Sequence, residues 1–326
     1  MALVSVIMAN YNKGAFIGDA IESVLYQTLA DVEVMVVDDG STDNSLGVVQ
    51  SYAARDQRVK LFSRHREPKG GNTCRNIGIE KATGKYLVFL DSDDLMMPFC
   101  LQQRVEAMEQ TKADVCLFKT GTFYEKIGDS KSFWIPPEAN YLHRFLMHDL
   151  PWNISSPIWK RAIIEQVNGF DESLIRLQDV DLHTRVLLVC KPVIHRFPDM
   201  AADCYYRIAE NRIIVSYADF VRNYVRGQLD YVNKTVPLLK ANSLEKKCKY
   251  LKGSLITALQ MPLYNYATKR IDDKVERELY DTVLNSPGAV ALLNTPDKWI
   301  LKFYRLLYRL GIKRKINGLF KKLLVR

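Results

Sequence analysis

Two stretches of the chain end an apolar run of strand length with acidic residues and a turn. Residues 89–94 read FLDSDD, and residues 36–41 read VVDDGS. In an open α/β sheet, ligands bind at the carboxyl ends of the strands. Two such ends that carry carboxylates can hold a nucleotide and its metal side by side, because hard cations such as Mg²⁺ take carboxylate and phosphate oxygens. Acidic residues are also common in turns that follow strands, so an isolated Asp-x-Asp does not establish a metal site.

The elements that must position these carboxylates alternate between strand and helix over residues 1–118. Apolar runs predict strands at 3–9, 33–37, 59–63, 85–90 and 114–118, and amphipathic patterns predict helices at 14–27, 43–55, 72–82 and 98–110. Such alternation indicates right-handed βαβ units and a mainly parallel central sheet flanked by helices. The fold class expected from the sequence is therefore α/β.

The rest of the chain is more helical. Residues 121–157 are irregular and rich in aromatic residues, which is typical of a functional loop or binding surface. Helices are predicted at 160–167 and 177–190, strands at 193–197 and 204–208, and an amphipathic helical region at 217–284. Residues 285–288 (NSPG) indicate a break before a basic tail.

The positive charge of the chain is concentrated in that tail. The whole chain has 46 basic and 37 acidic side chains, and residues 297–326 hold ten of the basic ones and one acid. Residues 1–296 therefore carry equal numbers of acidic and basic side chains.

The six cysteines lack the close pairs of a zinc site, and no apolar run approaches the ~20 residues of a membrane span. With no signal peptide before the first strand, we expect a cytoplasmic protein without disulfides.

Six segments, in this order, make the pattern specific. They are residues 4–12 (VSVIMANYN), 37–43 (VDDGSTD), 71–78 (GNTCRNIG), 84–94 (GKYLVFLDSDD), 169–172 (GFDE) and 178–181 (QDVD). Over roughly residues 3–215 the chain closely resembles the family 2 glycosyltransferases, which are inverting enzymes with the GT-A fold. The resemblance implies a nucleotide-sugar donor, usually a UDP-sugar, with Mn²⁺ or Mg²⁺ at its diphosphate. It also implies a glycan or lipid-linked acceptor in bacterial surface-polysaccharide synthesis.

The resemblance divides the chain into a GT-A domain at 1–215, a helical extension at 216–285 and the basic amphipathic tail at 286–326. Within the first domain, residues 1–118 form the nucleotide-binding half and residues 119–215 the acceptor-side half.

Three residues correspond to positions that bind the donor nucleotide in the family. Tyr11 matches the aromatic residue that stacks against the base, Asp39 the acid that accepts a hydrogen bond from uracil, and Arg75 the residue that fixes base or phosphate. A carboxylate in this place suits uracil or thymine, because a base without a ring N–H would leave it unpaired. Taken alone, Tyr11 could be an ordinary exposed tyrosine and Arg75 a solvated helix arginine.

The metal and the general base correspond to acids in the later segments. Asp93 matches the metal-binding acid and Asp91 the acid that contacts the ribose or the metal, with Ser92 between them in the donor-binding signature. Asp94 is interpreted as a cap of the following turn. Asp179 matches the general base, although many family members have Glu-Asp where this chain has Gln178-Asp179.

Some family members also carry a histidine near the diphosphate after the strand at 204–208. Residues 208–211 of this chain read IAEN, so this chain departs from those members by having no histidine there.

The tail predicts attachment to the cytoplasmic face of the inner membrane. Trp299, Ile300, Phe303, Leu307 and Leu310 recur at helical spacing, and Lys298, Lys302, Arg305 and Arg309 form a basic stripe beside them. An apolar face with Trp and Phe beside basic residues suits an interfacial helix on anionic lipid. The alternative is a tail that docks on its own catalytic domain or on a partner in a homodimer.

Three competing classes fit less well. A nicotinamide-dependent oxidoreductase needs Gly-x-Gly-x-x-Gly after its first strand, where residues 9–14 read ANYNKG. A nucleic-acid-binding protein needs a broad basic surface, which the neutral body does not offer, so no nucleic-acid partner is expected. A catalytically silent scaffold with the same fold would have no need for the complete set of acids.

Overall fold

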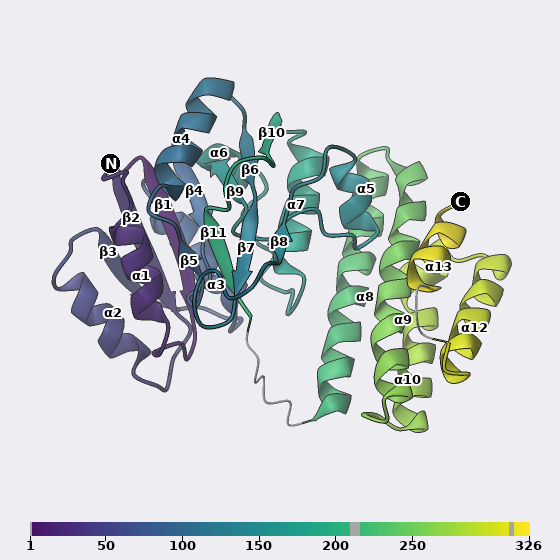
Figure 1. The fold of residues 1–326 in the computed structure, drawn as a ribbon. Helices are drawn as coiled ribbons and strands as arrows, with labels where there is room; N and C mark the ends of the chain where they lie inside the picture. Colours follow the sequence, from purple (N-terminus) through teal and green to yellow (C-terminus); the bar gives the residue numbers. More distant parts are fainter. Residues whose placement is uncertain (1, 209–215, 313–315) are drawn as a thin grey trace. The chain divides into compact units, whose positions relative to one another are not determined.

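The computed structural model describes residues 2–208, 216–312 and 316–326 (Figure 1). The chain divides into two compact units. Unit 1 takes in residues 1–139, 151–173 and 185–211, and unit 2 takes in residues 140–150, 174–184 and 212–326. Each unit is described by itself below. The domain boundaries expected at residues 118, 215 and 285 stay predictions.

The main sheet of unit 1 has seven strands in the described part of the chain. Their order is β10-β6-β9-β4-β1-β2-β3. Neighbours pair in parallel except β9, which is antiparallel to both β4 and β6. The strands are β1 (Val4–Asn10), β2 (Val32–Asp38), β3 (Val59–Ser63), β4 (Tyr86–Phe89), β6 (Val115–Phe118), β9 (Pro157–Lys160) and β10 (Ile194–Phe197).

A second sheet of four described strands has the order β5-β11-β7-β8. These strands are β5 (Leu95–Met96), β7 (Thr120–Phe123), β8 (Phe133–Trp134) and β11 (Cys204–Arg207). The strands β7 and β8 lie inside the stretch 121–157 that the sequence analysis expected to be irregular, apart from Thr120. Strands of two to four residues are too short to show a period in the sequence, which explains the difference.

The helices of unit 1 follow the expected alternation. They are α1 (Ile17–Leu25), α2 (Ser45–Ala53), α3 (Gly71–Lys81), α4 (Cys100–Thr111) and α6 (Arg161–Gln166). In α1 the buried side chains are Ile17, Ala20, Ile21 and Val24, one face of a helix. Strands β1, β2 and β4 are buried almost throughout, as expected for parallel strands covered on both faces.

One carboxylate lies inside this sheet. Glu33 of β2 accepts hydrogen bonds from Ser5 Oγ at 2.5 Å, from Thr83 N at 2.7 Å and from Lys60 Nζ at 2.6 Å. Burial raises the pKa of Glu33, but these donors, Lys60 foremost, lower it further, to about 2. The carboxylate is therefore held in its charged form and joins β1, β2, β3 and the turn before β4.

A buried ion pair holds α4 next to the segments that precede β9 and β11. The guanidinium of Arg104 on α4 and the carboxylate of Asp203 are both fully buried, and Arg104 Nη2 donates to Asp203 Oδ1 at 2.7 Å and Nε to Oδ2 at 2.8 Å. Arg104 Nη1 also donates to the carbonyl of Ser155 at 2.8 Å. One side chain thus ties α4 to the segment before β9 and to the residue before β11.

Unit 2 is helical in the described part of the chain. Its helices are α5 (Tyr141–Leu146), residues 178–184 of α7 (Gln178–Val189), α8 (Tyr217–Ala241), the 3₁₀ helix η1 (Glu245–Leu251), α9 (Lys252–Ala267), α10 (Asp273–Asn285), α11 (Pro287–Leu292), α12 (Thr295–Arg309) and α13 (Ile316–Val325). The break expected at 285–288 is the change from α10 to α11, where Ser286 caps α11 and Pro287 opens it. None of the helices in the described ranges has the length and hydropathy that crossing a membrane requires.

Helix α12 has apolar side chains on two opposite sides. Leu301, Tyr304 and Tyr308 are buried, and α12 packs against α9. At 100° per residue, a second stripe lies on the other side of the helix and is exposed. It consists of Trp299 (66% exposed), Phe303 (55%), Leu306 (49%) and Leu310 (66%). We call these four residues the α12 outer stripe.

The basic residues of α12 are divided between two roles. Arg305 forms an ion pair with Glu276 at 2.7 Å, and Arg309 pairs with Asp273. Lys298 and Lys302 are exposed, and Lys302 Nζ lies 4.8 Å from the ring centroid of Trp299. The basic stripe expected from the sequence is therefore half occupied by contacts to α10.

Candidate functional site

The strand register brings the two acidic segments to one edge of the main sheet. Strand β1 pairs with β2 so that Asn10 lies opposite Asp38, and it pairs with β4 so that Ile7 lies opposite Phe89. The amide of Leu90 continues the β4 pairing by donating to the carbonyl of Ile7 at 3.1 Å. Because all three strands run in parallel, the residues that follow them gather at the same carboxyl edge.

Asp38 builds the turn after β2. Its carboxylate accepts hydrogen bonds from Asn10 Nδ2 at 2.8 Å, Gly40 N at 2.9 Å and Ser41 N at 2.8 Å. Gly40 has φ +79°, a conformation that residues with a side chain rarely adopt. The carboxylate of Asp38 is therefore occupied by the turn, and Asp39 remains the candidate of the pair for binding a ligand.

Asp39 is 6% exposed and already has two donors. Arg64 Nε donates to Asp39 Oδ1 at 2.6 Å, and Gly70 N approaches the same oxygen at 3.3 Å. Arg64 directly follows β3 and was not among the residues that the sequence singled out. The rule that ligand-binding residues follow parallel strands would have identified it, since β3 neighbours β2.

Tyr11 directly follows β1 and has an accessible ring, with 44% of the residue exposed. Lys69 Nζ lies 3.9 Å from the centroid of this ring. The aromatic face therefore already attracts a cation, and it is open enough for a planar base to stack.

Arg75 and Asp91 are joined by a hydrogen-bonded ion pair. Arg75 Nη2 donates to Asp91 Oδ1 at 2.7 Å, and the guanidinium lies 5.4 Å from the centroid of the Phe170 ring. Arg75 is 9% exposed, so the solvated helix arginine considered from the sequence does not describe it. Its position on α3 connects the β4 acids to that helix.

Asp93 has its carboxylate in an ion pair with Lys13, which follows β1. Its backbone carbonyl accepts from Arg207 Nε of β11 at 2.9 Å. Ser92, between the two acids, is 4% exposed. Neither Lys13 nor Arg207 could be associated with Asp93 from the sequence, because they lie 80 and 114 residues away along the chain.

Asp94 is fully buried and does not cap the turn with its side chain as expected. Its Oδ1 accepts from Arg207 N at 2.9 Å, which attaches β11 to the acidic segment. Burial raises the pKa of Asp94 well above its ordinary value, and the nearby Asp91 carboxylate raises it further. Its Oδ2 is buried without a hydrogen-bond partner among the described residues.

The acids at the end of β4 are suitable in kind for a divalent cation. Asp91 and Asp93 offer hard carboxylate oxygens, which Mg²⁺ and Mn²⁺ prefer. Among the described residues, no group of three or more His, Cys, Asp or Glu could hold a metal by itself. A metal here would need further oxygens, and Mg²⁺ sites commonly take them from one or two carboxylates, water and substrate phosphates.

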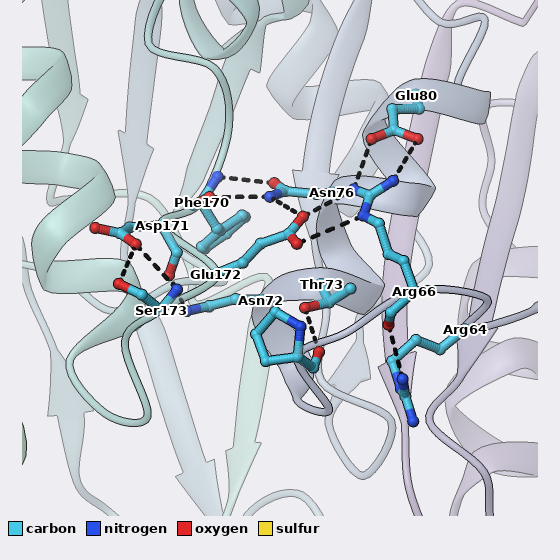
Figure 2. A network of polar contacts seen from close by, with 11 residues as sticks. Arg64, Arg66, Asn72, Thr73, Asn76, Glu80, Phe170, Asp171, Glu172 and Ser173 are labelled. Carbon is cyan, nitrogen blue, oxygen red and sulfur yellow. Dashed lines mark hydrogen bonds and ion pairs between the residues drawn. The ribbon is translucent and has the colours of Figure 1, made fainter.

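Figure 2 shows how the segment 169–173 is attached to α3 within unit 1. Asn76 Nδ2 donates to the carbonyl of Phe170 at 2.9 Å, and Asn76 Oδ1 accepts from Phe170 N at 2.8 Å. Gly169 has φ +64°, and a Cβ there would lie 2.4 Å from Asn76 Oδ1. Glycine is therefore required at this position, because its φ is positive and because a side chain would collide with Asn76.

The same segment is held by charges (Figure 2). Glu172 accepts from Arg66 Nη2 and from Asn76 Nδ2, both at 2.8 Å, and Arg66 also pairs with Glu80 at 2.7 Å. These bonds lower the pKa of Glu172, although burial alone would raise it. The GFDE segment thus supports α3, the helix that carries Arg75.

Asp179, the expected general base, belongs to unit 2. It lies in the first turn of α7 and is half-buried. The other six candidate residues lie in unit 1, where Tyr11, Asp39, Asp91, Ser92 and Asp93 follow the ends of β1, β2 and β4, and Arg75 contacts Asp91 from α3. Positions 209–211, where some family members place a metal-binding histidine, lie outside the described residues.

The arrangement of strands and helices defines an α/β protein of the GT-A type, with a helical C-terminal region. Residues 5–167, half of the chain, match the sequence model of glycosyl transferase family 2, and the chain belongs to that family. This confirms the family and the fold class expected from the sequence.

Curated relatives are similar over part of their length. The uncharacterized glycosyltransferase EpsJ of Bacillus subtilis is 32% identical over 195 residues, covering 54% of this chain and 54% of EpsJ. The glycosyltransferase GlyG of Streptococcus pneumoniae is 35% identical over 123 residues, covering 37% of this chain and 39% of GlyG. The chain thus spans about half or less of the length of these relatives.

Solved structures share the fold over almost the whole chain. Residues 1–349 of S. aureus TarS in complex with UDP-GlcNAc align with TM-score 0.66 at 20% identity, covering 99% of this chain and 92% of that one. The mannosyltransferase PcManGT of Pyrobaculum calidifontis, in complex with GDP-Man and Mn²⁺, aligns with TM-score 0.52 at 17% identity, covering 98% and 86%. At such identities the likeness establishes the fold.

Proposed function

We propose that this chain is an inverting glycosyltransferase that moves a sugar from a UDP-sugar to a hydroxyl of a glycan or lipid-linked acceptor in bacterial surface-polysaccharide synthesis. The observation that carries the proposal is the gathering of Asp39, Asp91 and Asp93 at the carboxyl edge of β2 and β4, beside the exposed ring of Tyr11. The TarS structure with UDP-GlcNAc supports a nucleotide-sugar at this edge, since it shares the fold.

The donor base is the part that Tyr11 and Asp39 recognise. Tyr11 stacks on uracil, and Asp39 accepts from its ring N–H. Arg64 donates a hydrogen bond to Asp39, so the carboxylate is held in position before the donor arrives. A cytosine ring has no N–H at the equivalent position and would leave a buried carboxylate facing an acceptor, which is unfavourable.

The donor diphosphate lies against the acids and cations that follow β1 and β4. Asp91 and Asp93, with Ser92 between them, would hold Mn²⁺ or Mg²⁺ at the diphosphate, and the metal would neutralise charge on the leaving group. Arg75 and Lys13, which now pair with Asp91 and Asp93, are close enough to these acids to contact phosphate oxygens as well. When the donor binds, the Arg75–Asp91 and Lys13–Asp93 ion pairs would thus be replaced by contacts of these residues with the metal and the diphosphate.

Transfer follows as a single displacement. The acceptor hydroxyl attacks the anomeric carbon from the face opposite the diphosphate, a bond to the acceptor oxygen forms, and the bond to the diphosphate breaks. Asp179 takes the hydroxyl proton as general base. One displacement inverts the anomeric configuration and needs no covalent intermediate with the protein.

We also propose that the protein attaches to the anionic cytoplasmic face of the inner membrane through α12. The α12 outer stripe presents Trp299, Phe303, Leu306 and Leu310 to solvent, and the exposed Lys298 and Lys302 lie beside it. Aromatic and aliphatic side chains next to lysines suit the boundary between anionic headgroups and acyl chains. Attachment would bring the enzyme and a lipid-linked acceptor onto the same surface.

The test of the donor assignment is a thermal-stability panel on the full chain. UDP, GDP and CDP, and the corresponding nucleotide-sugars, are added with and without Mn²⁺. Uridine nucleotides with Mn²⁺ should raise the melting temperature most, because a ligand that binds the folded state stabilises it in proportion to its affinity. Equal stabilisation by all bases would contradict the role of Asp39.

Two further measurements test catalysis. Donor binding without turnover on any acceptor would favour the catalytically silent scaffold. A product that keeps the anomeric configuration of the donor would contradict the inverting mechanism.

A further inference from the structure

A cavity in unit 2 is built from α8, α9 and the residues after α9. Its volume is about 430 Å³, which is within the range of pockets for small ligands. All of its lining residues lie between Tyr217 and Arg270, so the whole cavity belongs to one unit. None of these residues has a part in the donor site.

Aromatic rings form a large part of the wall. Tyr217, Phe220 and Tyr224 follow one another at spacings of three and four residues, so they share one face of α8. Tyr264 comes from α9 and is 44% exposed. Ring faces that line an open cavity offer flat apolar surfaces to a ligand, and sugar rings have flat C–H faces of matching shape.

Polar groups accompany the rings. Seven of the nine lining residues carry a hydrogen-bonding group in the side chain. Asn265 Nδ2 and Thr257 Oγ1 already donate to carbonyls of α9, at 2.9 Å and 3.1 Å, which leaves the amide of Gln260 and the tyrosine hydroxyls for a ligand. A cavity for a hydrocarbon chain would be lined by apolar side chains, since unpaired polar groups against hydrocarbon are costly. The lining therefore fits a ligand that has many hydroxyl groups.

The charge of the lining is positive. Arg270 is exposed, and its guanidinium carbon lies 5.0 Å from the centroid of Tyr217 and 6.0 Å from that of Tyr264. No acidic residue lines the cavity, and within the part of the chain that the structure describes no carboxylate forms an ion pair with Arg270. A carboxylate or phosphate on the ligand could therefore pair with the guanidinium of Arg270, which the rings of Tyr217 and Tyr264 already orient.

We infer that this cavity binds a saccharide unit that carries an anionic group, as a subsite for the growing glycan acceptor. The inference rests on the proposed glycosyltransferase function for the identity of the ligand, but the binding itself does not depend on the donor site. The rings stack on the sugar, the amide of Gln260 and the tyrosine hydroxyls bond its hydroxyl groups, and Arg270 pairs with the anion. The cavity thereby selects acidic glycans over neutral ones.

Calorimetric titration of the full chain tests this subsite with three probes. They are trigalacturonic acid, its methyl ester, which has the same rings without the charge, and inorganic phosphate. Arg270→Gln removes the cation, and Tyr264→Ala removes a ring. The matched controls are Arg226→Gln, an arginine whose side chain is 71% exposed, and Tyr26→Ala, a tyrosine that is 72% exposed.

The wild-type chain and both controls should bind trigalacturonic acid, and Arg270→Gln should lose about tenfold or more in affinity, the usual effect of removing a charged hydrogen-bond donor. Tyr264→Ala should weaken the acid and its ester alike, whereas UDP affinity and melting temperature should not change in either variant. Equal binding by Arg270→Gln and Arg226→Gln, or no saccharide binding at all, would overturn the inference. Phosphate that binds as tightly as the trisaccharide would also overturn it, since no sugar subsite would then exist. Failure of UDP binding in the wild-type chain would count against the donor assignment and leave this result standing.

Discussion

The ammonium group of Lys13, just after β1, is ion-paired with the carboxylate of Asp93, just after β4. The two residues are 80 positions apart in the chain, and the pairing of β1 with β4 brings them together. A divalent cation that uses Asp93 would have to compete with this lysine. The pair therefore offers a way to test the proposed metal site without measuring transfer.

We predict that Lys13→Ala binds Mn²⁺ more tightly than the wild-type chain when no nucleotide is present. The gain should be about two- to fivefold, because a partly exposed ion pair contributes up to about 1 kcal/mol. Electron paramagnetic resonance of free Mn²⁺ measures the affinity directly. Lys126→Ala makes the same change of net charge at an exposed position and is the control. An unchanged or weaker Mn²⁺ affinity in Lys13→Ala would show that the metal does not compete for Asp93.

Asp93→Ala should abolish transfer and weaken UDP binding in Mn²⁺ by roughly tenfold or more, since a metal contributes several kcal/mol of charge stabilisation. The melting temperature should change little, because the Asp93 side chain is 20% exposed and its pair with Lys13 is partly solvated. Turnover and calorimetry with and without chelator provide the measurements. Near wild-type turnover of the variant in the presence of chelator would show that the metal assignment is wrong.

Asp179→Asn should reduce turnover by ~10²–10⁴-fold and leave UDP affinity nearly unchanged, as expected when a positioned proton acceptor is lost. Gln178→Glu is the companion variant, since it restores the acidic pair common in the family. A second carboxylate favours the protonated form of its neighbour, so the acid limb of the pH–rate profile should move to higher pH. Near wild-type turnover in Asp179→Asn, or loss of UDP binding in that variant, would contradict the role of the base.

Glu33 makes folding stability depend on pH. Its pKa is lowered from 4.5 to about 2, so its contribution is fully present above about pH 4.5 and is lost as the pH falls toward 2. The shift corresponds to about 3 kcal/mol in favour of the folded state at neutral pH. Urea unfolding between pH 3 and pH 6 should show a smaller pH dependence for Glu33→Gln than for the wild-type chain. Parallel curves for the two proteins would mean that Glu33 is not the group responsible.

The double variant Trp299→Ser/Phe303→Ser should lose about tenfold or more in binding to vesicles that contain phosphatidylglycerol, because two large apolar side chains no longer enter the membrane. Truncation before α12 is less informative, since it would remove α13 as well and uncover the surface of α9 against which both helices pack. Val290→Ser, at a residue 62% exposed on α11, is the control. Equal co-sedimentation of all variants, or none by the wild-type chain, would contradict membrane attachment.

The parallel strands and their helices could be predicted because long buried runs and amphipathic periods are local properties. The expected strand 59–63 is β3, and the expected helix 72–82 is α3 displaced by one residue. Helix α5 and strands β7 and β8 could not be predicted, since each is at most six residues long. Their formation depends on contacts elsewhere in the chain, which no local pattern records.

The acids of the site could be predicted, but their partners could not. Asp39 and Asp93 belong to short motifs that follow apolar runs. Arg64 and Lys13 are 25 and 80 residues from the acids that they pair with, and only the order of the strands brings them close.

In the tail, too, the sequence pattern predicted the helix but not which of its sides is buried. Helical spacing identified apolar positions on α12, but it did not show that Leu301 is buried within unit 2 while Leu306 is exposed.

The buried pair of Arg104 and Asp203 constrains how this sequence can change over evolutionary time. A mutation of either residue alone leaves the other charge buried and uncompensated, which costs about 3–5 kcal/mol, a large part of the stability of an ordinary domain. Lysine cannot replace Arg104, because the pair uses two guanidinium nitrogens toward Asp203 and a third toward Ser155. Replacement by an apolar pair is physically acceptable, but every single-mutation route to it passes through an unstable protein. Lineages that have the pair should therefore keep both residues or lose both together, and the two positions should covary among descendants of this chain.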